Sequence, residues 1–168
     1  MSSQRRIGGG PTLVAGAVPA ISVVLASFLA ALPIVSTSGW YPDFGYVALI
    51  AWRLLRAEPW PAWWAAPLGL VNDLFTGYPI GFSVALWSAT MLVLDLIDRR
   101  TMWRDYWTEW GLAAVLIAID EWLQWRIAGL VGAAPPIIRI VPPLVISIAI
   151  FPLIAWIISR IDARRLGR

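Results

Sequence analysis

Long apolar runs, separated by short polar or proline-containing stretches, make up most of this chain. A helix needs about 20 predominantly apolar residues to cross the hydrocarbon core of a bilayer. The pattern therefore predicts an all-α integral membrane protein, folded as a compact six-helix bundle. The predicted spans are about 13–35, 43–57, 60–76, 79–98, 107–131 and 137–159.

The second and third of these segments are shorter than the others, and Glu58 and Pro59 lie between them. They are either two thin or distorted spans or a re-entrant hairpin buried against the rest of the bundle. Both alternatives return the chain to the side from which it came. Prolines inside several segments, among them Pro19, Pro67 and Pro152, predict kinked helices.

Composition supports a membrane protein and leaves little room for anything else. Hydrophobic residues make up 60% of the 168 residues and charged residues 14%, with a mean hydropathy of +0.73. A separate soluble catalytic domain usually needs on the order of 100 residues. We therefore expect one membrane domain, 1–168, with tails at 1–12 and 160–168. The first apolar run is longer than the roughly 7–15 residues of a signal peptide core, so we expect it to be an uncleaved span.

The chain contains no Cys and no His, and all its basic residues are Arg. This excludes thiol chemistry, the usual zinc sites and catalytic triads that use imidazole. We expect no enzyme activity, no cofactor and no metal. The basic residues lie in predicted loops and tails rather than in a soluble patch, so nucleic acid is not an expected partner either.

The distribution of arginine predicts the orientation, because cytoplasmic loops carry an excess of basic residues. A cytoplasmic N-terminus places most arginines inside and only Arg126 and Arg139 towards the outside. Both termini are then cytoplasmic. The arginines on the inner side are Arg5, Arg6, Arg53, Arg56, Arg99, Arg100, Arg104, Arg160, Arg164, Arg165 and Arg168.

The stretch 69–82, GLVNDLFTGYPIGF, places Asp73 in apolar surroundings between glycines. On a helix, Gly69, Asp73 and Gly77 lie on one stripe, which lets a neighbouring backbone approach the carboxylate. Pro79 is expected to stop this helix and Gly81 to open the next segment.

Ionisable residues inside a membrane are costly and are candidates for function. In the predicted topology Asp43, Asp73, Asp120 and Glu121 share the outer half of the membrane with Arg126 and Arg139. Glu121 and Arg126 are about 140° apart on an ideal helix and cannot pair easily with each other. We expect interhelical pairs instead, such as Arg126 or Arg139 with Asp73 or Asp120. Arg53 is expected to reach the inner surface.

Two interpretations of this charge cluster remain open. It is either a set of buried pairs that fix the bundle, with the glycines allowing close packing, or an outward-facing polar groove that receives a partner's helix or a small ligand. Neither a nucleophile nor a phosphate-binding loop accompanies the acids, so hydrolysis is a weaker interpretation.

Gly69, Asp73, Gly77, Pro79 and Gly81 form a G-L-x-x-D-x-x-x-G-x-P-x-G pattern that resembles the signature region of the rod shape-determining protein MreD family. The length, the aromatic and basic end of the second segment and the basic tail resemble the family as well. The resemblance implies a fold similar to the substrate-binding S components of energy-coupling-factor vitamin transporters. It also implies a non-catalytic scaffold of the bacterial cell-elongation machinery, located in the inner membrane as a multi-pass protein.

In such a scaffold the motif serves as an architectural element or forms the edge of the surface that binds the partner. The implied direct partner is an MreC-like single-span protein, and the less direct ones are MreB filaments, RodA and a class B penicillin-binding protein. Membrane lipids are expected to surround the scaffold. Through these partner proteins the scaffold couples the filaments to peptidoglycan synthesis. The alternative on the same fold is a small-molecule-binding membrane subunit of a vitamin-type transporter. The two differ in whether a protein or a solute fills the outer groove.

Overall fold

The computed structural model of the protein describes residues 13–32, 41–55, 61–100, 105–130, 132 and 136–165. These residues contain six α-helices and no strand, which confirms the all-α prediction. Short 3-10 turns, Leu29–Ala31, Ala62–Trp64 and Ile137–Ile140, follow α1 and precede α4 and α7. The helices are α1 (Leu13–Phe28), α3 (Phe44–Leu55), α4 (Ala65–Thr76), α5 (Phe82–Arg100), α6 (Tyr106–Leu130) and α7 (Val141–Arg165).

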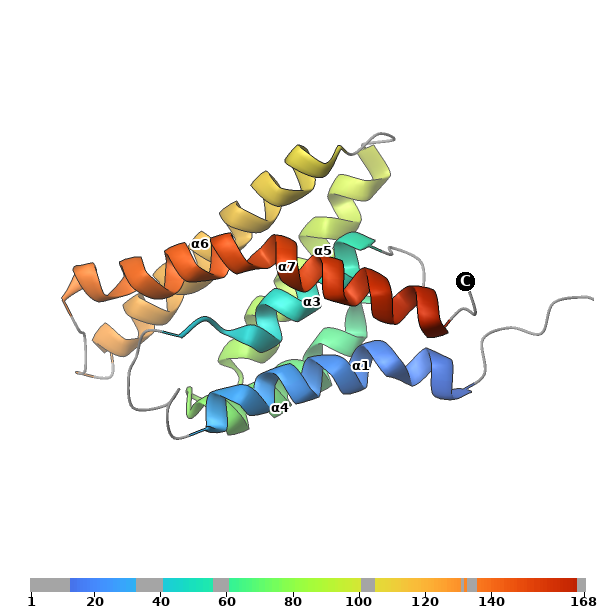
Figure 1. Ribbon diagram of the computed structural model, residues 1–168. Helices are drawn as coiled ribbons and strands as arrows, with labels where there is room; N and C mark the ends of the chain where they lie inside the picture. The colour runs from blue at the N-terminus through green and yellow to red at the C-terminus, as the bar shows by residue number, and fades with distance from the viewer. Residues whose placement is uncertain are drawn as a thin grey trace, which may run out of the picture.

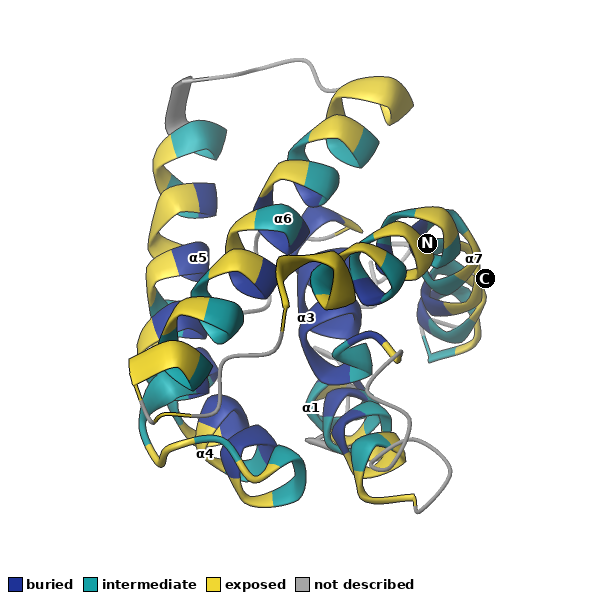
Figure 2. Cartoon of the chain, turned by 90° about the vertical axis from the view of Figure 1, so that its left-hand side faces the viewer, coloured by how far each residue is buried: buried dark blue, intermediate teal, exposed yellow. Residues whose placement is uncertain are grey.

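The short helix α3 lies at the centre of the bundle, with the other helices around it (Figure 2). Its sequence, FGYVALIAWRLL, is apolar on nearly every side, which is typical of a helix enclosed by others. Every residue from Gly45 to Leu54 is buried. The predicted short second segment is thus the core of the fold.

The last helix is the longest apolar element. Together with the preceding turn it runs from Ile137 to Arg165, and it is the one helix among the described residues that is long and apolar enough to cross a membrane on its own. α7 continues to Arg165, so the first residues of the predicted tail 160–168 are helical. Apolar but shorter helices are found at Gly16–Ala31 and Phe44–Leu55.

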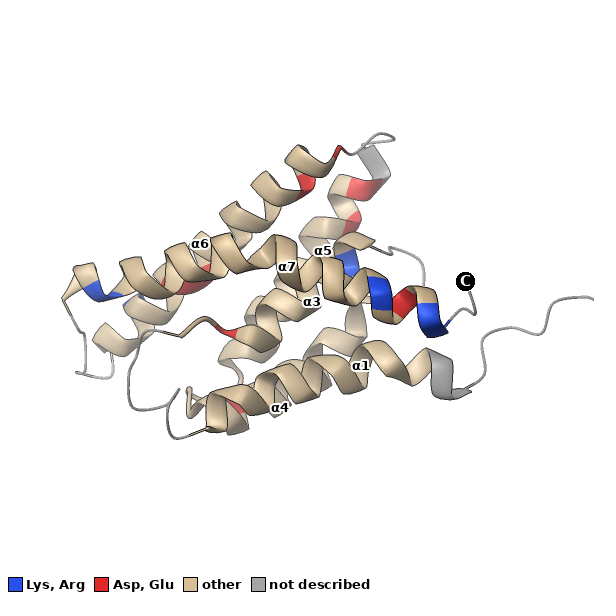
Figure 3. Cartoon of the chain, in the orientation of Figure 1, with Lys and Arg blue, Asp and Glu red and all other residues tan. Residues whose placement is uncertain are grey.

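The first residue of α1 and the last residue of α7 lie at the same end of the molecule (Figure 1). We call this the terminal end. The basic residues of α7 are found there, whereas the start of α7, with Arg139 just before it, lies at the opposite end (Figure 3). The turn between α4 and α5 is at this opposite end as well.

The surface of the bundle is unusually apolar for a water-soluble protein, and the apolar core also contains polar and charged side chains. Exposed residues lie on the outer faces of the helices (Figure 2). Many of them are large and apolar, whereas several polar and charged side chains are buried. The exposed apolar residues include Ile21, Leu25, Leu70, Leu74, Leu92, Leu96, Val115, Ile119, Val145, Leu153, Trp156 and Ile157. The buried polar residues include Ser27, Arg53, Asn72, Asp73, Ser83, Thr90, Asp120 and Glu121.

Arg53 corrects one expectation at the terminal end. Its side chain does not reach the surface but is 2% exposed, and it forms ion pairs with Asp95 and Asp98 of α5. The Arg53 Nη1 to Asp98 Oδ2 distance is 2.8 Å. A buried guanidinium needs such partners, because an unpaired charge there is strongly unfavourable.

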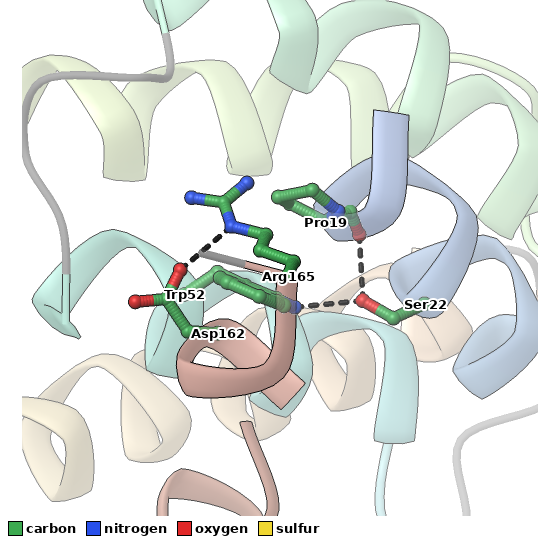
Figure 4. Close-up of polar contacts among 5 residues, drawn as sticks. All are labelled: Pro19, Ser22, Trp52, Asp162 and Arg165. Atoms are coloured by element: carbon green, nitrogen blue, oxygen red, sulfur yellow. Dashed lines mark hydrogen bonds and ion pairs between the residues drawn. The ribbon is translucent and has the colours of Figure 1, made fainter. Parts of the chain in front are cut away.

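Close to Arg53, Trp52 joins three helices (Figure 4). Its indole Nε1 donates to Ser22 Oγ of α1 at 2.7 Å, and this hydroxyl donates to the carbonyl oxygen of Pro19 at 2.7 Å. The Arg165 guanidinium of α7 lies 5.4 Å from the Trp52 ring centre, and its Nε donates to Asp162 Oδ1 at 2.7 Å. The cluster fixes α1 and α7 to the central helix.

Candidate functional site

The carboxylate of Asp73 caps the following helix. It is 1% exposed, and its Oδ2 and Oδ1 accept the backbone N–H groups of Gly81 at 2.7 Å and Ser83 at 2.8 Å. The first turn of a helix has free N–H groups and a partial positive charge, so a carboxylate there is favourable. The acid that the sequence placed in apolar surroundings is held by α5, and no arginine contacts it among the described residues.

The other motif residues shape the turn between α4 and α5. A Cβ added to Gly69 would lie 2.7 Å from backbone atoms of Ser83 and Val84, so the expected close approach of a neighbouring backbone is confirmed there. Gly77 has a φ of 73° and ends α4 as its C-cap, while Gly81 has a φ of 100°. Both angles favour glycine.

Two expectations about this turn are wrong. No atom lies within 4 Å of a Cβ added to Gly77, so that glycine serves a backbone angle and not close packing. Pro79 does not stop the helix, since α4 already ends at Thr76. Instead, the carbonyl oxygen of Pro79 accepts the N–H of Phe82 at 3.0 Å, where α5 begins.

A side-chain network links this turn to the central helix. Asp43 precedes α3 and caps it, because its Oδ1 accepts the N–H of Tyr46 at 3.0 Å. Asn72 Nδ2 donates to Asp43 Oδ2 at 2.8 Å and to Ser83 Oγ at 3.2 Å. The ends of α3, α4 and α5 are thereby joined through one buried amide.

A second network lies along α6. Asp120, which is 2% exposed, accepts Gln124 Nε2 at 3.0 Å, and the Tyr78 hydroxyl donates to Gln124 Oε1. Burial raises the pKa of Tyr78 well above its usual range, and the nearby carboxylates of Asp43, Asp120 and Glu121 raise it further. The hydroxyl therefore remains a hydrogen-bond donor.

A cavity of about 380 Å³ lies between the two networks, at the end of the molecule opposite to the terminal end. The start of α3, the end of α4, the second half of α6 and the start of α7 form its walls. The carboxylates of Asp43 and Glu121 line it, with Gln124 and the exposed Arg139. Its aromatic walls are Tyr41, Phe75, Tyr78 and Trp125.

The predicted charge cluster is only partly brought together. Asp120 and Glu121 are buried as expected, but within the described ranges no ion pair joins Arg126 or Arg139 to an acid, so the proposed interhelical pairs are wrong. Arg126 is exposed, with its guanidinium 5.8 Å from the ring centre of Trp122 on the same helix. Arg139 lines the cavity from the start of α7.

Sequence reasoning missed the roles of Asn72, Tyr78 and Gln124, and although it placed Asp43 in the charge cluster, it did not recognise Asp43 as the cap of α3. Asp43 could have been found, because an acid that follows a proline and precedes an apolar helix is a common N-cap signal. Asn72 gave no such signal, since its partners are 29 and 11 residues away.

The geometry thus consists of a capped turn at the α4–α5 junction beside a polar and aromatic cavity. No protein-family model, curated protein or solved structure matches this chain.

Proposed function

We propose that the chain is a multi-pass protein of the bacterial inner membrane that acts as a non-catalytic scaffold, similar to MreD. The observation that carries the membrane placement is the apolar surface: large apolar side chains are exposed on α1, α4, α5, α6 and α7, while several polar side chains are buried within the core. In water such a surface is an aggregation risk, whereas lipid tails accommodate it.

Short helices are compatible with this placement. The central helix α3 has 12 residues, or about 18 Å at 1.5 Å per residue, and is shorter than the roughly 30 Å hydrocarbon core. Because other helices surround α3, its ends and their polar groups face protein rather than lipid, as buried segments in membranes require. We assign the terminal end to the cytoplasm on the basis of its arginines.

The role of a scaffold rests on the resemblance of the motif. Each of its five residues has a part in closing the α4–α5 turn: Gly69 through close packing, Asp73 through capping, and Gly77, Pro79 and Gly81 through backbone geometry and hydrogen bonds. A motif that fixes architecture suits a rigid protein that positions its partners. We propose the MreC-like single-span protein as the direct partner, and MreB, RodA and a class B penicillin-binding protein as indirect ones.

The test is isolation of the full chain from its native membranes, followed by identification of the proteins that accompany it. Single cysteines at exposed apolar positions, such as Ile21, Leu74, Leu92, Ile119 and Ile157, then allow crosslinking to the partner's helix. A scaffold gives an MreC-like companion and crosslinks from one face of the bundle. Isolation without that companion, together with crosslinks from no face, contradicts the proposal.

The motif residues are poor probes for this interaction. Asp73 is 1% exposed and Gly69 packs against backbone, so substitutions there alter the fold before they alter any surface. Exposed apolar residues are better probes, because substitution of their side chains leaves the core unchanged.

The cavity favours a second candidate, a small-molecule-binding membrane subunit of a transporter. Polar side chains converge on it and aromatic side chains line it, and its volume of about 380 Å³ falls in the range of roughly 300–1,000 Å³ typical of ligand sites. A binding subunit is expected to hold a solute without any other protein present, which the isolated chain can test directly.

A further inference from the structure

Glu121 is the most unusual side chain of the cavity. It is 7% exposed and lines the cavity from α6, yet no hydrogen bond or ion pair to it is found within the described residues. A buried carboxylate is unfavourable unless it is paired or hydrogen-bonded. Its acceptor atoms are therefore available to a group that enters the cavity.

A second carboxylate faces the same space from another element. Asp43 lines the cavity from the start of α3, and its oxygens accept neutral donors, the backbone N–H groups of Gly45 and Tyr46 and the amide of Asn72. These contacts orient the carboxylate but leave its charge uncompensated. The one cationic side chain among the lining residues is the exposed Arg139, so two acids face one base.

The remaining walls suit the body of an organic cation. Tyr41, Phe75, Tyr78 and Trp125 surround the cavity, and aromatic faces attract cations and pack against apolar rings. Gln124 offers an anion at most one neutral N–H, because its Nε2 already donates to Asp120 and its Oε1 accepts the Tyr78 hydroxyl. An anionic ligand would meet Asp43 and Glu121 with only Arg139 to offset them.

We infer that the cavity binds a small aromatic ammonium compound, with its ammonium group beside Glu121 and Asp43 and its ring against the aromatic walls. This deepens the second candidate function by naming a ligand class. It rests on the cavity and not on any partner protein, so the absence of an MreC-like companion would leave it unaffected, and failure to bind the amine would leave the scaffold proposal unaffected.

The experiment uses the purified full chain in detergent and isothermal titration calorimetry with three probes of nearly the same size. Phenethylamine carries the ammonium group, phenethyl alcohol is neutral and phenylpropionate is an anion. Phenethylamine is expected to bind, and the other two at least about tenfold more weakly, because a hydrogen bond to a charged group contributes about 1.5–3 kcal/mol. Equal binding of the alcohol, preference for the anion, or no binding of the amine overturns the inference.

Three variants locate the binding. Glu121→Gln keeps the shape and is expected to weaken phenethylamine binding about tenfold or more. Ala128→Phe fills the cavity without a change of charge and is expected to abolish binding. Asp105→Asn removes an exposed acid before α6, away from the cavity, and is expected to bind as the wild type does.

The thermal midpoint of each variant without ligand establishes that it is folded. Unchanged amine affinity in a folded Glu121→Gln or Ala128→Phe variant contradicts the placement in this cavity. If one of the two fails to fold, the other decides the question.

Discussion

The N–H of Ser83, in the first turn of α5, donates to the Asp73 carboxylate of the preceding helix at 2.8 Å. The second oxygen of Asp73 accepts the N–H of Gly81 at 2.7 Å. A cap usually comes from the residue just before a helix, whereas here it comes from one helix earlier. The bond therefore fixes the angle of the turn as well as the start of α5.

Removal of this cap is expected to destabilise the protein. Asp73→Ala leaves two N–H groups without their acceptor, at about 1–3 kcal/mol each. Asp73→Asn keeps one acceptor oxygen and is expected to lose less stability than Asp73→Ala. Unfolding in mixed detergent micelles measures the effect, with Leu74→Ala as the control because Leu74 is 67% exposed. An Asp73→Ala protein as stable as Leu74→Ala contradicts the capping role.

Replacement by alanine is expected to change the stability of the protein in opposite directions at two glycines on different helices. In Gly69→Ala the new Cβ meets the backbone of Ser83 at 2.7 Å, and such overpacking costs about 1–3 kcal/mol. Gly111 has no atom within 4 Å of an added Cβ, so Gly111→Ala gains up to about 1 kcal/mol of helix propensity. Comparison of the two unfolding midpoints with that of the wild type checks the prediction, and a Gly69→Ala protein at least as stable as the wild type argues against close packing at Gly69.

The buried arginine of the central helix is expected to be essential for stability. Arg53→Leu leaves the acids Asp95 and Asp98 without their guanidinium, and loss of one partner of a buried pair costs about 3–5 kcal/mol. Both acids are partly exposed, so the lower part of this range is expected. Addition of Asp95→Asn and Asp98→Asn to the Arg53→Leu variant should restore much of the lost stability, because no unpaired charge then remains. A lack of recovery would mean that the loss comes from packing and not from charge.

The hydrogen bond between Trp52 and Ser22 is suited to a double-mutant cycle. Trp52→Phe and Ser22→Ala each remove one partner, and the double variant removes both. The coupling energy is expected to be about 0.5–1.5 kcal/mol, as for a typical intramolecular hydrogen bond. Strictly additive effects would show that the two side chains do not stabilise each other.

The helices were predictable from the sequence because each is an apolar run bounded by glycine, proline or charge. Gly77, for example, ends α4 and Gly81 precedes α5. The position of α3 at the centre was less visible: its apolar sequence fits lipid contact as well as burial, and only packing decides between them.

The candidate site was predictable only in part. The burial of Asp73, Asp120 and Glu121 followed from their apolar surroundings, but their partners did not. Arginine was expected beside Asp73, yet backbone N–H groups occupy that position. Every residue except proline carries such a donor, so the sequence does not indicate which ones will bind the carboxylate. The sequence placed Asp43 and Glu121 in the same half of the membrane, but the aromatic walls of the cavity come from separate segments and are brought together only by the fold.

The membrane placement is the central claim, and cysteine labelling tests it most directly because the chain has no natural cysteine. Single cysteines replace Leu92, Ile119 and Leu153 on the exposed apolar faces of α5, α6 and α7. Arg139 and Arg164 are replaced at the two ends of α7, where both are exposed.

In intact cells a membrane-impermeant maleimide is expected to label Arg139→Cys alone. In broken cells Arg164→Cys should be labelled as well. The cysteines at the three helix positions should be labelled only after denaturation in detergent. Labelling of Leu92→Cys, Ile119→Cys and Leu153→Cys in folded protein as rapid as that of Arg139→Cys would mean that these faces meet water, and would contradict a bundle embedded in the membrane.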